Sequence, residues 1–263
     1  MATMQNWALI TGASSGIGRA VAAELARQGY NLYLTARDEQ SLQQVAADCQ
    51  QRYKIESQIH AADLSRPESV DGLIRAVAAQ PSEIEILVNN AGFGVGGEFL
   101  KTDLARELDL MNVQLAATLK LTKAVLPQMI ARKKGRILNV ASVYSFAPAP
   151  YQAVYSGCKA FLLSLSESLR VELKGTGVTV TALCPGTTRT RFRARAGIAH
   201  RNDAAGASPE AVARVAVRQT LQGKPLVVPG FANKLFVFVT RRLPFSLVPR
   251  VVRFINSARG VNE

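Results

Sequence analysis

The sequence predicts a single α/β domain in which a parallel sheet is covered by helices on both sides. Short apolar runs alternate with segments of helical periodicity along most of the chain, which is typical of parallel strands joined by crossover helices. The length of 263 residues suits one such domain with a large core and is short for two. Because no repeat, low-complexity tract or flexible linker interrupts the pattern, we expect one domain.

The first third of the chain predicts four strands, and the loop after the first strand is rich in glycine. The helix that begins in this loop should end at Gly29, because glycine readily adopts the left-handed conformation that stops a helix. Ser65-Arg66-Pro67-Glu68 has the pattern of a capping box with an early proline, and it predicts a helix that ends near Ala79. The other expected elements are strands at 6–11, 31–35, 56–60 and 84–88 and a helix at 39–52.

The rest of the domain continues the same alternation. Pro148 and Pro150 precede a long helix at 152–174, and Ser208 is the expected cap of a later helix that ends near Gln222. The remaining expected elements are helices at about 103–112 and 113–133, strands at 135–141 and 177–184, and a short strand at 225–228.

The C-terminal segment, residues 231–263, has a composition of its own. It predicts two short helices, at 231–242 and 248–258, on either side of Pro244. Five arginines stand there among leucine, valine and phenylalanine: Arg241, Arg242, Arg250, Arg253 and Arg259. That composition is typical of a helix lying in a membrane interface, but we favour a lid that packs over a substrate pocket. In neither case is the segment expected to be an independent domain.

The charge of the chain is unevenly distributed. Residues 1–184 contain 18 Lys and Arg against 16 Asp and Glu, whereas residues 185–263 contain 14 against 3. Nearly all of the net charge of +13 therefore lies in the last part, which favours an acidic partner. The candidates are an anionic membrane surface, an acidic carrier protein or a phosphorylated substrate, and a merely solvated basic face is an equal alternative. Nucleic-acid binding is not expected, because no recognition motif accompanies the charge.

Several classes of site and location are disfavoured. Cys49, Cys158 and Cys184 form no CxxC pair, and we expect them to be reduced thiols in a cytoplasmic protein. No secretory signal precedes the first strand, and no apolar stretch approaches the ~20 residues of a spanning helix. His60 and His200 are far apart and lack a cysteine or carboxylate pattern, so no metal site is expected.

The glycine-rich loop, TGASSGIG at 11–18, predicts a dinucleotide site. Between a strand and a helix, backbone N–H groups and the helix dipole can meet a pyrophosphate. Gly12 allows the tight turn, Gly16 lets the backbone approach the phosphates, and Gly18 brings the helix close to the sheet. Two loop hydroxyls can add phosphate contacts, those of Ser14 and Ser15.

The end of the second strand favours NADP over NAD. An acid there would bind the ribose 2′-hydroxyl, whereas an arginine pairs with a 2′-phosphate. The chain has Ala36-Arg37-Asp38, and we interpret Arg37 as the phosphate ligand and Asp38 as pointing to solvent. Asp63 can accept a hydrogen bond from the adenine amine, and Asn90 can line the cofactor cleft.

Tyr155 and Lys159 stand four residues apart and share one face of a predicted helix. The lysine charge should favour the tyrosinate and lower the Tyr155 pKa below its ordinary ~10. Tyr155 can then be the general acid when a ketone is reduced, or the general base when an alcohol is oxidised. Ser142, at the end of its strand, can hold the carbonyl oxygen. Together with the glycine loop, these residues indicate a nicotinamide-dependent carbonyl reductase.

In these motifs the chain resembles the short-chain dehydrogenase/reductase family over residues 5–230. The matching stretches are TGASSGIG at 11–18, DL at 63–64, NNAG at 89–92, Asn112, Ser142, YSGCK at 155–159 and PGTTRT at 185–190. The resemblance implies a Rossmann-type three-layer α/β/α sandwich with a seven-stranded parallel sheet in the order 3-2-1-4-5-6-7. It also implies a homodimer or homotetramer that forms through the helices around 103–133 and 152–174.

The resemblance further implies roles for single residues. Asn112 would help to hold a water relay to Lys159, Lys159 would also bind the nicotinamide ribose, and Thr190 would cap the nicotinamide site. With Asn112, Ser142, Tyr155 and Lys159 as the catalytic set, residues 1–230 are the expected NADP-binding catalytic domain. The expected NADP(H) contacts are Gly12, Ser14, Ser15, Gly16, Ile17, Gly18, Arg37, Asp63, Leu64, Asn90, Ala91, Gly92, Tyr155, Lys159, Pro185, Gly186, Thr188 and Thr190.

The substrate pocket should lie in loops that follow strand ends, at 93–99, 143–151 and 187–206. The expected apolar lining is Phe93, Val143, Tyr144, Phe146, Tyr151 and Phe192, and the third loop is rich in arginine. An apolar pocket with a cationic rim suits a lipid-like ketone or steroid, or an acyl chain on an acidic carrier or coenzyme A. Core packing of the aromatics remains an open alternative. The alternative function is a non-catalytic NADP-binding protein that acts at a membrane surface or on an acidic carrier, but such a protein would not need the catalytic set.

Overall fold

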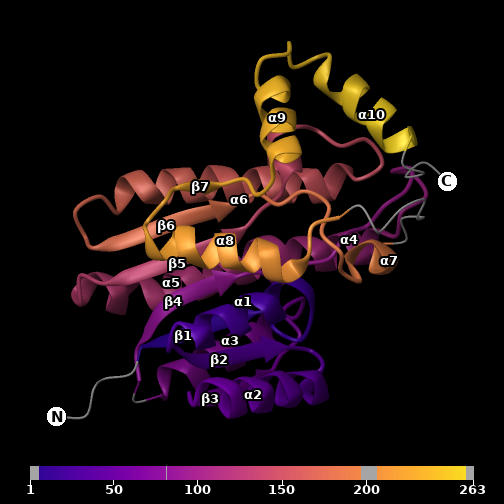
Figure 1. The fold of residues 1–263 in the computed structure, drawn as a ribbon. Coiled ribbons are helices and arrows are strands. Elements are labelled where there is room, and N and C mark those ends of the chain that lie inside the picture. Colours follow the sequence, from indigo (N-terminus) through magenta and orange to yellow (C-terminus); the bar gives the residue numbers. More distant parts are fainter. Residues whose placement is uncertain (1–5, 81, 197–205, 259–263) are drawn as a thin grey trace.

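The computed structural model describes residues 6–80, 82–196 and 206–258 (Figure 1). Seven strands form one parallel sheet in the order β3-β2-β1-β4-β5-β6-β7, which confirms the expected topology. The strands are β1 (Trp7–Thr11), β2 (Asn31–Ala36), β3 (Ser57–Ala61), β4 (Ile84–Asn89), β5 (Gly135–Val140), β6 (Val178–Leu183) and β7 (Leu226–Val227).

Helices cover both faces of the sheet and give the three layers seen in Figure 1. The alternation of side chains along a strand separates two cores: Ala8 and Ile10 of β1 pack in one cluster, whereas Trp7 and Leu9 pack in the other. The first core is closed by α1 (Gly16–Arg27), α2 (Glu39–Tyr53) and α8 (Pro209–Leu221). The second core is closed by α3 (Pro67–Ala78), α5 (Ala117–Ala131) and the last turns of α6 (Ala153–Glu172).

The strand order reverses at β1, which pairs with β2 on one side and with β4 on the other. In open parallel sheets ligands bind outside the carboxyl ends of the strands at such a switch point. The glycine loop follows β1, and Asn90 follows β4. The topology therefore brings together two segments that lie some 80 positions apart, as the hydrogen bonds between Thr11 and Asn90 show.

Two details of the helices differ from the sequence expectation. The two helices expected at 103–112 and 113–133 form one continuous rod, in which α4 (Leu104–Met111) passes through a π-helical stretch, Asn112–Ala116, into α5. The predicted capping box at Ser65 is wrong, because Arg66 is the N-cap residue of α3 and has no side-chain cap. The Ser65 hydroxyl instead donates to Asp63 over 2.8 Å. Pro67 does open the helix, as expected.

The C-terminal segment forms the two expected helices, α9 (Phe231–Thr240) and α10 (Val248–Ala258). Figure 1 shows them standing away from the sheet, beyond β7 and α6. Val248 and Val252 of α10 are buried in one cluster with Ala147 and Ala149. The hairpin is thus anchored on the loop that follows β5, which is one of the expected substrate loops, 143–151. Within the described ranges, no helix is long and apolar enough to cross a membrane.

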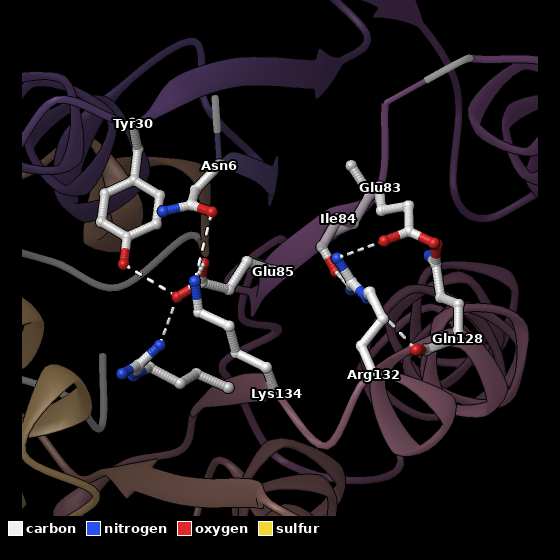
Figure 2. A network of polar contacts seen from close by, with 9 residues as sticks. Asn6, Tyr30, Glu83, Ile84, Glu85, Gln128, Arg132 and Lys134 are labelled. Carbon is white, nitrogen blue, oxygen red and sulfur yellow. Dashed lines mark hydrogen bonds and ion pairs between the residues drawn. The ribbon is translucent and has the colours of Figure 1, made fainter. Parts of the chain in front are cut away.

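A network of charged side chains closes the other edge of the sheet, at the amino ends of β4 and β5 (Figure 2). The buried Glu85 carboxylate pairs with Arg136 and with Lys134, the latter at 2.7 Å, and accepts a hydrogen bond from the Tyr30 hydroxyl over 3.0 Å. Beside it, Arg132 pairs with Glu83 at 2.9 Å. Every charge that this edge buries therefore has a partner of opposite sign.

Candidate active site

The glycine loop is held tightly against the end of β4. Gly12 has φ +66°, and a side chain at this position would meet Asn90 Nδ2 at 2.8 Å. A Cβ on Gly18 would lie 2.2 Å from the Gly12 carbonyl oxygen, so only glycine lets α1 approach the loop this closely. Gly16 has φ +57° and faces Thr190. The loop thus keeps the shape of a phosphate cradle, as expected of its three glycines.

Thr11 links this loop to the end of β4, a role that its place in the TGASSGIG motif did not predict. Its hydroxyl accepts hydrogen bonds from the backbone N–H groups of Asn90 and Ala91, both over 2.9 Å. It donates to the Val88 carbonyl over 3.2 Å. The Asn90 amide in turn donates to the Thr11 carbonyl over 2.8 Å. Asn90 therefore fixes the backbone of the glycine loop by hydrogen bonds, in addition to any contact with a cofactor.

Ser15 is the N-cap residue of α1, yet its side chain accepts no hydrogen bond from the first turn. Ser14, Ser15 and Ile17 are all half-buried on this loop. The first-turn N–H groups of a helix have no intrahelical partner, and they favour an anion. The loop therefore fits a dinucleotide pyrophosphate by both its shape and its donors.

The expected adenosine end lies where β2 and β3 finish. Arg37 is exposed and lies near Asp63, while Asp38 is exposed and caps α2 by accepting from the Ser41 N–H over 3.0 Å. Burial raises the pKa of Asp63, but hydrogen bonds from Ser65 and the charges of Arg37 and Arg66 outweigh it, and the pKa falls below its ordinary value. Asp63 is thus an ionised acceptor at this corner. The Leu64 side chain is buried in the core, so only its backbone can face a ligand.

Ser142 and Lys159 are joined by a short chain of hydrogen bonds. Ser142 caps the 3-10 turn Val143–Phe146, and its N–H donates to the Ser145 hydroxyl over 3.2 Å. That hydroxyl donates to the Lys159 carbonyl over 2.7 Å. The end of β5 is thereby fixed to α6, one turn beyond Tyr155. This arrangement places Ser142 near the Tyr155 hydroxyl, where it opposes the rise in the Tyr155 pKa that burial causes.

Lys159 is buried at 4% exposure, and its ammonium group donates to the Val140 carbonyl over 2.7 Å. Its Nζ lies 5.6 Å from the centroid of the Tyr155 ring. Within the described part of the chain, no carboxylate forms a salt bridge with it. Burial therefore lowers the pKa of Lys159 to about 8.

The expectation of a lowered Tyr155 pKa is wrong for this structure. Tyr155 is buried, and this burial raises its pKa well above the ordinary value; the hydrogen bond with Ser142 opposes the rise only in part. The error arose because helical spacing shows that the lysine is near but does not show how deeply the phenol is buried. Tyr155 is consequently a protonated phenol at neutral pH.

Asn112 opens the π-helical stretch, and its side-chain amide donates to the Ser65 carbonyl over 3.2 Å. It thus ties the rod of α4 and α5 to the loop after β3. Two residues further in the same stretch, the buried Gln114 donates to the Phe93 carbonyl over 2.8 Å and packs against Gly92. π-helical turns are frequent at functional sites, and this one positions two of the expected ligand loops.

The apolar side chains expected in the substrate pocket divide into two groups. Phe93, Tyr144 and Phe192 pack around Tyr155, and the rings of Phe192 and Tyr155 lie 5.3 Å apart. Phe146 lies elsewhere, packed with Leu162 and Cys184. The structure thus brings only part of the expected lining to Tyr155.

The remaining lining residues are Val143 and Tyr151. The Val143 N–H donates to the Pro185 carbonyl over 3.1 Å, so its backbone joins two of the loops. Tyr151 has φ +65°, a strained conformation for a bulky residue, and it packs against Ala196. Its carbonyl accepts from the Gly97 N–H over 2.9 Å. Tyr151 therefore connects the loop before α6 with the loop after β4.

The PGTTRT loop contacts the glycine loop, where Thr190 faces Gly16, and the C-terminal hairpin, where Gly186 faces Asn233. The Thr188 hydroxyl donates to the Gly186 carbonyl over 3.2 Å, and the Thr190 hydroxyl accepts from the Phe192 N–H over 3.2 Å. A side chain on Gly186 would lie 2.1 Å from Asn233 Oδ1 of α9. The loop continues into α7 (Phe192–Arg195), and the expected substrate residues 197–205 lie outside the described residues.

Beneath the site runs a buried polar chain that the sequence analysis missed. Asn89 donates to Asn139 over 2.8 Å, and Asn139 donates to Ser166 over 2.9 Å. These contacts link the carboxyl ends of β4 and β5 to α6. Their only sequence signal is an asparagine near the end of each apolar strand. As for metals, no group of three or more His, Cys, Asp or Glu side chains among the described residues could hold an ion.

Comparisons with known proteins agree with this geometry. A family model described as short chain dehydrogenase matches residues 6–200. The very-long-chain 3-oxoacyl-CoA reductase of Laccaria bicolor is 36% identical over 179 residues, 67% of this chain and 53% of that protein. The inactive hydroxysteroid dehydrogenase-like protein 1 of Homo sapiens is 37% identical over 213 residues, 80% of this chain and 64% of that protein.

Among solved structures, a short-chain dehydrogenase from Sphingobium yanoikuyae in complex with NADPH has a TM-score of 0.82 at 31% identity. The match covers 90% of this chain and 93% of that one. The chain therefore belongs to the short-chain dehydrogenase family. It spans only 53% and 64% of the length of the two curated relatives named above.

Proposed function

We propose that the protein is an NADPH-dependent carbonyl reductase that acts on a hydrophobic ketone or the corresponding secondary alcohol. The observation that carries the proposal is a buried, protonated Tyr155 with Ser142 near its hydroxyl and Lys159 one helical turn away. The three side chains lie at the same edge of the sheet as the glycine loop. A binding protein would gain nothing from a buried lysine that no carboxylate pairs with among the described residues.

The residues at the carboxyl edge of the sheet fit a dinucleotide. Gly12, Gly16 and Gly18 would hold the pyrophosphate, and Asp63 would accept from the adenine. The PGTTRT loop with Thr188 and Thr190 would cover the nicotinamide. When bound, the nicotinamide supplies the hydride that reduces the carbonyl carbon.

The chain itself supplies the proton. Ser142 orients the carbonyl oxygen, and Tyr155 donates its phenolic proton to that oxygen as the alcohol forms. Lys159 is charged below about pH 8, and its ammonium group then stabilises the tyrosinate that remains. Cys158 takes no part, because burial raises the pKa of this thiol to about 11 and it packs among apolar side chains.

Two observations support NADP as the cofactor. Arg37 follows β2 with an alanine before it, so no acid stands where a ribose 2′-hydroxyl would be bound. A similar structure at 31% identity was solved with NADPH. For the substrate, the apolar cluster around Tyr155 favours an acyl or steroid-like ketone, in agreement with the 3-oxoacyl-CoA reductase among the relatives.

A homodimer or homotetramer is part of the proposal. Leu104, Leu108 and Met111 form an exposed apolar stripe along α4 at i, i+4 and i+7, and Phe161 is exposed on α6. Exposed apolar patches of this kind mark interfaces between chains. The two helices carrying them are those for which the family resemblance implies subunit contacts.

The test is oxidation of NADPH and of NADH by the pure protein, against aliphatic, aromatic, steroid and 3-oxoacyl carbonyls. Turnover with a preference for NADPH is expected. Arg37→Ala should raise KM for NADPH by about tenfold to a hundredfold and leave KM for NADH unchanged, since only the 2′-phosphate loses its partner. Arg75→Ala, an exposed arginine on α3, is the matched control. Equal effects of Arg37→Ala on both cofactors would contradict the assignment of Arg37.

The alternative is a protein that binds NADPH without turning it over. The observation that supports this alternative is the similarity to the relative described as an inactive hydroxysteroid dehydrogenase-like protein. NADPH binding without oxidation across the whole panel would favour it over the reductase.

A further inference from the structure

We propose that the C-terminal hairpin, residues 231–258, docks the protein on an anionic lipid bilayer. The proposal rests on the outer surface of α9 and α10 and does not depend on the reaction. It departs from the sequence expectation, which favoured a lid over a membrane contact, because the two helices prove to have separate inner and outer faces.

The inner face is used by the fold. Val248 and Val252 of α10 are buried against Ala147 and Ala149, with Phe236 of α9 packed on the same cluster. Asn233 of α9 contacts Gly186. The hairpin is therefore fixed to the domain, and its outer face has a defined direction.

The outer face of each helix carries an apolar stripe at the spacing i, i+4 and i+7. On α9 the stripe is Phe231, Leu235 and Phe238; leading into α10 it is Leu247, Val251 and Phe254. Phe231 is 82% exposed and Phe254 is 77% exposed. Phe245, in the turn between the helices, is 76% exposed. A packed domain does not leave four phenylalanines in water without a partner for them.

The charges around the stripes identify the kind of partner. Five basic side chains of the hairpin are all exposed: Lys234, Arg241, Arg242, Arg250 and Arg253. The sequence contains no Asp or Glu from residue 211 to residue 262. Aromatic side chains with surrounding arginines, and no acid, match an interface of acyl chains and anionic headgroups.

A second copy of the chain fits this surface less well. Joining two hairpins would bring their arginines together, and neither hairpin offers an acid to neutralise them. The guanidinium of Arg242 already lies 3.6 Å from the centroid of the Phe238 ring. Such a stacked pair can enter a headgroup layer together, with the ring toward the acyl chains and the charge toward the phosphates.

Docking would also orient the candidate site. The hairpin is anchored on residues 147–149 and on Gly186, which adjoin the loops around Tyr155. If the proposed function holds, a hydrophobic ketone could reach the pocket from the bilayer. The docking itself is tested without any turnover, so failure of the reaction and failure of the docking are separable.

The experiment is flotation of the full chain with vesicles of phosphatidylcholine, with and without about 30% phosphatidylserine. We expect binding to the anionic vesicles, little binding to the neutral ones, and weaker binding at high salt. Phe238→Asp with Phe254→Asp should lower the bound fraction about tenfold, because it places charge on both stripes. Val171→Asp, at an exposed apolar position on α6, is the matched control and should bind as the parent does.

A second measurement uses tryptophan fluorescence. Trp7 is the only tryptophan and is buried in β1, so its emission provides a constant background. Phe245→Trp should shift its emission to the blue on anionic vesicles, and Val171→Trp should not. Vesicle binding that survives the Phe238/Phe254 substitutions, or an unshifted Phe245→Trp spectrum, would overturn the proposal. So would a change from dimer to monomer in the double variant without any vesicle binding by the parent, since a second copy would then be the occupant.

Discussion

The two edges of the sheet bury charge in opposite ways. At the amino ends of the strands, the buried Glu85 is surrounded by Lys134, Arg136 and the Tyr30 hydroxyl (Figure 2). At the carboxyl ends, the equally buried Lys159 has, among the residues that the structure describes, a single backbone carbonyl as its acceptor. The first arrangement matches a charge with partners, whereas the second leaves a charge uncompensated.

The difference separates stability from function. A buried charge with partners costs little once folded, while one without partners destabilises the fold and shifts its own pKa. Perturbed groups of this kind gather at reactive sites. The edge with the matched charges therefore stabilises the sheet, and the other edge gives up stability to keep a lysine beside Tyr155.

Tyr30 and Tyr155, one at each edge, differ in what raises their pKa. Burial and the nearby Glu85 carboxylate raise the pKa of Tyr30 to about 12. Burial alone is the main cause of the raised Tyr155 pKa. Tyr30 donates permanently to a fixed carboxylate, whereas Tyr155 has a proton that it can give to a substrate oxygen.

Among the substitutions that test this comparison, Glu85→Ala should change the free energy of unfolding most. Removing the acid leaves Arg136 and Lys134 near the buried edge without an acidic partner, and we expect a loss of about 3 kcal/mol in the free energy of unfolding. Urea denaturation would measure it. Glu83→Ala is the control: its pair with Arg132, in which the carboxylate is exposed, should be worth under about 1 kcal/mol. Equal losses from both variants would show that the buried network contributes no more to the free energy of unfolding than the Glu83–Arg132 pair.

Lys159→Met should instead raise the free energy of unfolding. With the Lys159 pKa near 8 in the folded protein against 10.5 for the free side chain, burial of the charge costs about 3 kcal/mol at pH 7. Subtracting about 1 kcal/mol for the hydrogen bond to Val140 leaves a net gain in stability of about 2 kcal/mol. The same variant should lose turnover. A less stable Lys159→Met protein would mean that the lysine is compensated after all.

The gain from Lys159→Met should also depend on pH. The unfolded chain binds more protons at this lysine than the folded one between about pH 8 and 10.5, so the contribution of Lys159 to stability rises with pH across that window. The stability difference between the variant and the parent should therefore be constant below pH 8 and shrink above it. Taking the difference cancels the titration of the buried thiols and tyrosines common to both proteins. A difference that is flat up to pH 10 would contradict a lowered Lys159 pKa.

The smallest effect should come from Tyr30→Phe. It removes one hydrogen bond to Glu85 but leaves both basic partners, and we expect a loss of about 1 kcal/mol. Thermal unfolding would detect it, with turnover per folded molecule unchanged. A loss as large as that from Glu85→Ala would shift the weight of the network from the ion pairs to the tyrosine.

Local patterns in the sequence predicted the strands, most helices and the glycine loop of the candidate site. Gly12 and Gly18 are required by contacts that their motif spacing already indicates, and Gly29 does stop α1 with φ +84°. The strand order came from the family resemblance and agrees with the structure. Local patterns failed where a property depends on burial or on a competing partner. The pKa of Tyr155 depends on how deeply the phenol is buried. The Ser65 hydroxyl donates to Asp63 instead of capping α3. The contact of Asn233 with Gly186 joins positions too far apart for any local pattern to show.

Turnover by Tyr155→Phe, measured as NADPH oxidation at saturating ketone, tests the central claim most directly. The substitution removes one oxygen from a buried side chain and leaves the ring against Phe192. We predict a loss of about 10²–10⁴-fold in kcat with NADPH affinity retained, because only the proton donor is gone. Full turnover by Tyr155→Phe would contradict the account, since the proton would then have to come from elsewhere.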